Sequence, residues 1–200
     1  MPAILTASRS SSRTACKLAI SMALVSPGVA LAHPGHDAGF FSALLHPFIG
    51  WDHLLAAIAV GIWGARLGAR SMWLMPTVFV GAMLAGMGLA ATGLSVPMSE
   101  VGIALSIAVL GTLIVLDARL HALPGACLMA LFALFHGAAH GAATVPLVAT
   151  YALAITAGTI LLHTIGIASA VALAARARVL RLAAAPVAIT GMALLLLRLQ

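Results

Sequence analysis

The chain has 200 residues, of which 63% are hydrophobic and only 7% are charged, with a formal net charge of +6 at pH 7. Its mean hydropathy is +1.17, and a soluble domain of this length has too little interior to bury so much apolar surface. These values exclude an ordinary soluble domain and predict a membrane protein. The apolar stretches are continuous, whereas barrel strands alternate polar and apolar residues, so the pattern favours an all-α, polytopic bundle.

Residues 1–32 have the pattern of a cleaved signal peptide. A basic region precedes an apolar run, and Ala30-Leu31-Ala32 fits a small-x-small cleavage site. The alternative is an uncleaved anchor helix, which Pro27-Gly28 disfavours because this pair interrupts the run early. Cleavage would leave residues 33–200 as the mature domain. It would also lower the net charge from +6 to +3, since three of the ten Lys and Arg residues leave, so the charge does not indicate nucleic-acid binding.

Six apolar segments follow, each close to the roughly 20 residues that a membrane-spanning helix needs. They are residues 47–65, 72–93, 98–116, 123–141, 146–173 and 182–198. Arginines lie in alternate loops, namely Arg66, Arg70, Arg119, Arg176, Arg178 and Arg181. By the positive-inside rule these loops are cytoplasmic, so the mature N-terminus and the C-terminus face the periplasm. Together with the export signal, this pattern predicts a six-span protein in the lipid bilayer of a bacterial inner membrane.

The first span carries an aspartate and a histidine where lipid is expected. Pro47 suits the first turn of a helix, which places His46 at the outer rim and Asp52 and His53 further in. Ionisable groups at such depth are expensive and indicate function.

Other polar residues gather on the same side of the membrane. His136 and His140 lie one turn apart on one face of the fourth span, near its outer end. Glu100 begins the third span on that side, and His36 lies just outside the bilayer, with His33 and Asp37. His163, about two thirds of the way through the fifth span, would be a deeper step.

These residue types suit a divalent transition metal. Neutral imidazole binds nickel, cobalt, copper and zinc, and a carboxylate compensates the charge of a dication in a low-dielectric site. The predicted metal-handling residues are His46, Asp52, His53, His136, His140, His163, His36 and Glu100. No catalytic residues and no prosthetic group are expected. The metal is expected to be cargo.

The segment from His46 to Ala56, followed by Ala59-Val60-Gly61-Ile62-Trp63, resembles the signature of the HupE/UreJ family of hydrogenase- and urease-accessory membrane proteins. The segment Phe135–Gly141 resembles the second histidine motif of that family, and Tyr151–Gly166 resembles its fifth span. The resemblance implies a six-span nickel (or cobalt) permease that supplies metal indirectly to nickel enzymes. One position departs from the family pattern, because Ala142-Ala143-Thr144 stands where a glutamate is common.

The leading hypothesis is therefore a gradient-driven permease, since the chain contains no nucleotide-binding motif. One alternative is an intramembrane zinc hydrolase, in which three histidines would hold the ion and Asp52 or a bound water would act on a substrate. The other is a metallocentre accessory protein that does not transport. The metal, a coupling ion and a homo-oligomeric state are left open.

Overall fold

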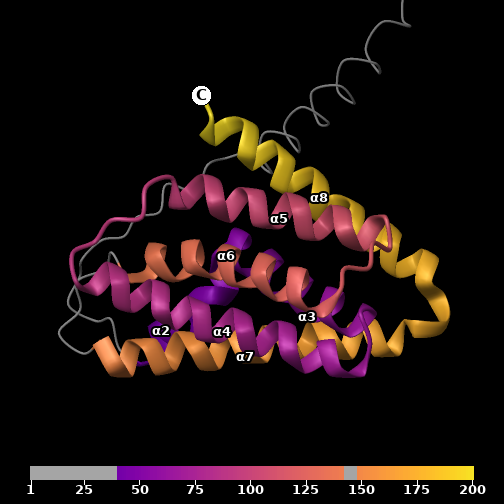
Figure 1. Cartoon of the computed structure of the whole chain (residues 1–200), viewed down its shortest axis with the longest axis horizontal. Coiled ribbons are helices and arrows are strands. Elements are labelled where there is room, and N and C mark those ends of the chain that lie inside the picture. The colour runs from indigo at the N-terminus through magenta and orange to yellow at the C-terminus, as the bar shows by residue number, and fades with distance from the viewer. Residues whose placement is uncertain (1–39, 142–147) are drawn as a thin grey trace, which may run out of the picture. The chain divides into compact units, whose positions relative to one another are not determined.

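The computed structural model describes residues 40–141 and 148–200, and every regular element within these ranges is a helix (Figure 1). In chain order these are α2 (Phe40–Ile49), α3 (Trp51–Arg66), α4 (Ala69–Ala91), α5 (Ser99–Val115), α6 (Ala122–Gly141), α7 (Val148–Ala172), the 3-10 helix η1 (Ala174–Arg176) and α8 (Ala177–Arg198). The all-α prediction is confirmed for this part of the chain. The expected signal peptide and the segment Ala142-Ala143-Thr144 lie outside the described residues.

The first apolar segment forms two helices, α2 and α3, which meet at Gly50 with an angle of 77° between them. Gly50 leaves the helical conformation, with a ψ of 104°. The prediction that Pro47 begins a helix is wrong, because Pro47 lies inside α2. Pro47 lies in the last turn of this short helix and is buried against α7, where a Cβ at Gly158 would lie 3.3 Å from the Pro47 ring.

By length and composition, four helices are able to cross a membrane, namely α4, α6, α7 and α8. The bent α2–α3 pair makes a fifth if the two helices count as one span, and α5 is apolar but shorter, with 17 residues. Each of the six apolar segments thus corresponds to a helix or a helix pair. The described chain is that of a multi-pass membrane protein.

Helix α3 contacts α2, α4, α5 and α7, and α5 packs along α8 (Figure 1). The close approach of α3 to α7 requires glycine, because a Cβ at Gly61 would overlap the backbone carbonyl of His163. The same holds between α4 and α6, where a Cβ at Gly137 would overlap the carbonyl of Met83. Small residues allow membrane helices to pack this closely. These contacts therefore fix the height of His163 and of His136 relative to the neighbouring helices.

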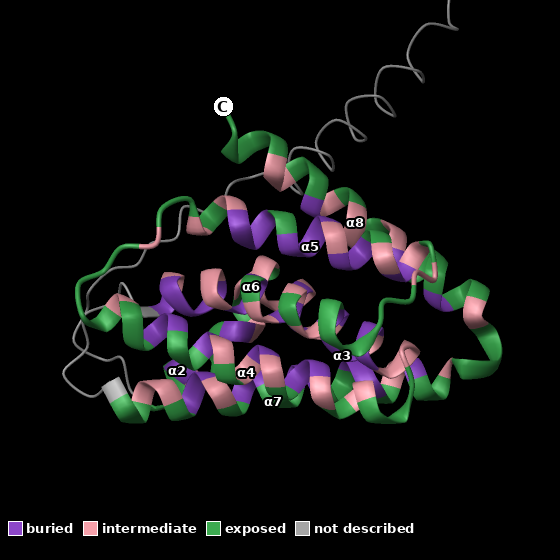
Figure 2. Ribbon diagram, in the orientation of Figure 1, coloured by how far each residue is buried: buried purple, intermediate pink, exposed green. Residues whose placement is uncertain are grey.

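Each α-helix has buried and exposed positions (Figure 2), and large apolar residues occur among both. The most deeply buried include Trp63, Phe79, Phe132, Met75 and Met83. On α8, by contrast, only Leu180, Ala184 and Gly191 are buried. Outward faces rich in leucine and valine suit lipid rather than water.

Candidate metal centre

Four histidines from three helices form one cluster. His46 lies in the last turn of α2, His53 in the first turn of α3, and His136 and His140 near the end of α6. The ring centre of His53 is 4.5 Å from that of His140 and 4.9 Å from that of His136. The ring centre of His46 is 5.1 Å from His140 and 5.9 Å from His53. We call these four residues the histidine cluster.

The histidine cluster extends from the protein surface into the bundle. His46 is exposed, His53 is partly buried, and His136 and His140 are only 2% and 4% exposed. The helix break at Gly50 lies beside it, so α2 ends and α3 begins at the cluster. Helix breaks of this kind frequently form the ion sites of transporters, because helix ends present charge to the ion.

Asp52 holds His53 in one orientation. Its Oδ1 accepts a hydrogen bond of 2.9 Å from the His53 backbone N–H and lies 2.9 Å from His53 Nδ1. A carboxylate acceptor at Nδ1 requires a proton there, so Nε2 of His53 keeps its lone pair. That Nε2 is buried and has no hydrogen-bond partner. Histidines that bind a metal through one ring nitrogen usually donate the N–H of the other nitrogen to a carboxylate, as His53 does to Asp52.

Ser106 of α5 orients a second histidine of the cluster. Its hydroxyl donates to the carbonyl of Ile103 at 2.7 Å, and its oxygen lies 3.0 Å from His136 Nε2. Since the single hydroxyl proton is used, the Ser106 oxygen accepts a hydrogen bond from His136 Nε2–H, and Nδ1 of His136 keeps its lone pair. Sequence reasoning missed Ser106, although a serine in the middle of the apolar α5 was a usable signal.

The rings have the spacing of a shared metal site, but their nitrogens do not converge. Two imidazoles on one ion, with metal–nitrogen bonds of about 2.0–2.1 Å, have ring centres roughly 4.5–5 Å apart. Three of the four ring separations in the cluster are close to this range. Within residues 40–141 and 148–200, however, no three His, Cys, Asp or Glu side chains direct their ligating atoms at one point. Metal binding would therefore require side-chain rotation within the cluster.

His163 of α7 lies outside this cluster. Its Nδ1 is 2.8 Å from the carbonyl of Ala57, which accepts a hydrogen bond, and its Nε2 is buried without a partner. The ring is 2% exposed and pairs with the ring of Phe79 at 5.2 Å. Phe79, which sequence reasoning also missed, pairs with His136 on its other side at 5.4 Å.

The remaining predicted residues are not brought into the cluster. Glu100, in the first turn of α5, forms an ion pair with Arg198 at the end of α8, and both side chains are substantially exposed. This pair neutralises the one arginine that departs from the expected charge pattern. His36 lies outside the described residues.

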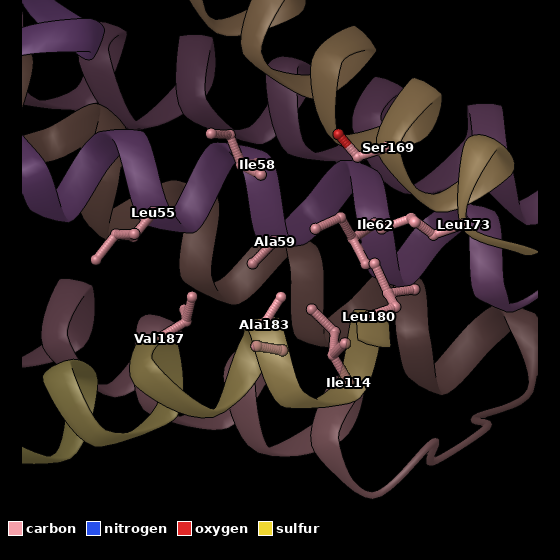
Figure 3. A pocket seen from close by; sticks show the side chains of 11 residues that line it. Leu55, Ile58, Ala59, Ile62, Ile114, Ser169, Leu173, Leu180, Ala183 and Val187 are labelled. Carbon is pink, nitrogen blue, oxygen red and sulfur yellow. The ribbon is translucent and has the colours of Figure 1, made fainter. Parts of the chain in front are cut away.

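The pocket drawn in Figure 3 is a poor cation site. It has a volume of about 290 Å³ and lies among α3, α5, α7 and α8, and Ser169 is the only polar residue in its lining. The Ser169 hydroxyl already donates to the carbonyl of Ile165 at 2.8 Å. An apolar pocket cannot replace the hydration shell of a dication.

A polar clamp joins α3 to the loop after α5, among the loops expected to be cytoplasmic. Arg66 donates to Asp117 Oδ1 at 2.6 Å, and this hydrogen bond holds the pKa of the partly exposed Asp117 carboxyl below its usual range. Beside it, the Trp63 indole N–H donates to the carbonyl of Ala118 at 3.1 Å. Arg181 of α8 donates to the carbonyl of Val115 at 2.6 Å. These bonds tie the ends of three helices together on the side away from the histidine cluster.

Comparison with known proteins identifies the family. The family model described as HupE / UreJ protein matches residues 20–194. Protein HupE of Rhizobium leguminosarum bv. viciae is 39% identical over 178 residues, which cover 86% of this chain and 93% of that protein. No solved structure matches the chain. Proteins of this family are transport and accessory proteins and not enzymes. The match over nearly the whole chain shows that this protein belongs to the HupE / UreJ family.

Proposed function

We propose that this protein is a permease that imports nickel, or cobalt, across the inner membrane of a bacterium through the histidine cluster. Membership of the HupE / UreJ family supports a role in metal handling. The observation that carries the proposal is the buried, unpartnered Nε2 of His53. Asp52 orients this ring through Nδ1, and the other three histidines of the cluster surround it. Such an atom is costly unless a ligand uses it.

The residues of the cluster have distinct roles in this proposal. His46, at the exposed end, meets the ion first. His53, His136 and His140 then replace part of its hydration shell, while Asp52 orients His53 and supplies negative charge. His163 receives the ion deeper in the bundle. His36, with His33 and Asp37, collects the ion at the outer surface before it reaches His46. Glu100 is paired with Arg198 and does not belong to the cluster.

The topology of the proposal follows the arginine pattern. Residues 1–32 are a cleaved signal peptide, and residues 33–200 form a six-span domain with both termini in the periplasm. Arginines in alternate loops support this orientation. The histidine cluster then lies at the periplasmic end, and the clamp between Arg66 and Asp117 lies at the cytoplasmic end.

The driving force is the membrane potential. A negative interior favours the influx of a dication by about 4.6 kcal/mol per 100 mV, since each elementary charge contributes about 2.3 kcal/mol. In this proposal the membrane potential alone drives the influx, and no nucleotide hydrolysis is required. The imported ion is supplied indirectly to nickel enzymes of the cell. Metal preference depends on the ligand set, and the segment Ala142-Ala143-Thr144 provides no carboxylate to it.

The test is transport by the purified protein. Liposomes that contain the protein and a trapped metal-sensitive dye receive external nickel under an inside-negative potential. We expect dye quenching that depends on the protein, and a large reduction with His53→Ala and His140→Ala. His121 is exposed and lies just before the other end of α6, so His121→Ala is the matched control. We expect this variant to keep the wild-type rate. A metal-binding but non-transporting accessory protein would bind nickel and leave the dye unchanged, which would overturn the proposal.

A further inference from the structure

Phe79 of α4 contacts two histidines of the proposed route. Its ring centre is 5.4 Å from that of His136 and 5.2 Å from that of His163. Within the described helices, each of these histidine rings pairs with Phe79 and they do not pair with each other. The Phe79 side chain is 2% exposed, so it contacts both rings inside the closely packed bundle.

One face of α7 carries three polar side chains, two of which have an atom without a partner. Thr156, Thr159 and His163 follow one another at spacings of three and four residues, which places them on one side of the helix. The Thr156 hydroxyl oxygen and His163 Nε2 are both buried with no hydrogen-bond partner. An unsatisfied buried polar atom costs about 1–3 kcal/mol. Two of them on one helix face indicate a surface that meets a polar species at some stage.

This face of α7 packs against the same face of α4 that carries Phe79. The Thr159 hydroxyl lies 3.9 Å from the sulfur of Met83, which follows Phe79 by one helical turn. Met75 precedes Phe79 by one turn, and both methionines are buried. Methionine is unbranched and changes rotamer readily. The Phe79 ring is therefore flanked along α4 by side chains that can yield to its rotation.

A dication that moved from His136 toward His163 along the Phe79 side would meet an apolar ring. The ring has no lone pair to offer, and a cation–π contact contributes only about 0.5–2 kcal/mol. Removing a charge from water without ligands costs tens of kcal/mol. Apolar side chains that exclude water in this way act as gates in channels.

We propose that the Phe79 ring is the gate between the histidine cluster and His163, and that its rotation limits the rate of metal passage. This inference rests on the proposed function. Closed, the ring separates the two sites and prevents other ions from following an open polar path. Rotated toward Met75 or Met83, it exposes the Thr159 hydroxyl and His163 Nε2 to the ion.

The experiment measures nickel influx into proteoliposomes and, separately, nickel binding to the solubilised protein. Phe79→Ala and the milder Phe79→Leu make the side chain at the proposed gate smaller, and Phe79→Trp makes it larger. We expect Phe79→Ala and Phe79→Leu to raise the maximal influx rate severalfold, and Phe79→Trp to lower it severalfold. The affinity for nickel in the binding assay stays within about twofold in all three, because Phe79 is not a ligand. Phe132→Ala is the matched control, since Phe132 is equally buried, at 2%, and forms no ring pair with a histidine in the described helices.

The outcomes separate the gate from the permease itself. If wild-type protein moves no nickel, the proposed function fails and the gate fails with it. If wild-type protein moves nickel but influx through Phe79→Leu and Phe79→Trp equals the wild-type rate, only the gate is refuted. Equal acceleration by Phe132→Ala would also refute it, because the effect would then be general loosening of the core. Phe79→Leu and Phe79→Trp keep an apolar side chain of substantial size, so the test does not depend on the stability of Phe79→Ala.

Discussion

Replacing Asp52 should weaken metal binding without removing a ligand. Asp52 Oδ1 accepts two hydrogen bonds of 2.9 Å from His53, one from the ring and one from the backbone. In Asp52→Asn the amide oxygen still accepts, but without charge, whereas Asp52→Ala removes both bonds and frees the ring of His53. Loss of such an outer partner typically lowers metal affinity 10–100-fold, which is about 1.4–2.7 kcal/mol. We therefore expect about tenfold weaker binding in Asp52→Asn and nearer to hundredfold in Asp52→Ala.

The assay is nickel titration of the solubilised protein by calorimetry, followed by uptake of nickel-63 in cells over a range of concentrations. Asp117→Asn makes the same chemical change at an aspartate whose partner is Arg66, far from the histidine cluster along α3. Its nickel affinity should match that of the wild type. Wild-type affinity and uptake in Asp52→Ala would refute the reasoning, because the orientation of His53 would then not matter.

Three further predictions concern other contacts. Ser106→Ala removes the acceptor of His136 Nε2–H and should lower nickel affinity about tenfold, whereas exposed Thr164→Ala, whose hydroxyl bonds within α7, should leave it unchanged in the same titration. Gly137→Ala forces a Cβ into the Met83 carbonyl and should destabilise the fold by about 1–3 kcal/mol, while Gly88→Ala, which has open space around it, should not lower the thermal midpoint in detergent. The pKa of Asp117 is lowered by Arg66, so this pair stabilises the fold above the ordinary range of an aspartate and loses its effect as the pH falls through the lowered pKa. The stability difference between wild type and Asp117→Asn should be small, at most about 1 kcal/mol. Followed through the thermal midpoint, it should begin to shrink at about pH 4 and disappear only when the pH is below the lowered pKa of Asp117.

The sequence predicts the helices well, because these follow from local patterns, and four of the eight predicted metal-handling residues lie together in the histidine cluster. Long apolar runs predict helices, and equal depth along different spans placed His46, His53, His136 and His140 together. The prediction of Pro47 as a helix start failed because a proline near a glycine fits two structures. It can begin one straight helix or, as here, lie in the last turn of a short helix before a break at Gly50.

Contacts between distant segments could not be predicted in this way. Ser106 reaches His136 only because α5 and α6 pack at one particular height, and Phe79 reaches His163 only because α4 passes α7. The partner of Glu100 could not be predicted either. The sequence predicts that Glu100 lies at the same depth as the histidines. In the structure, its carboxylate pairs with Arg198 at the end of α8.

X-ray absorption of the nickel-loaded protein tests the central claim most directly. The claim is that a divalent ion binds to imidazole nitrogens of the histidine cluster after their side chains rotate together. The spectrum should show several imidazole ligands with metal–nitrogen distances near about 2.1 Å, and this signal should diminish in His53→Ala and His140→Ala but persist in His121→Ala. A first shell of oxygen atoms alone, or a spectrum that His53→Ala leaves unchanged, would contradict the claim.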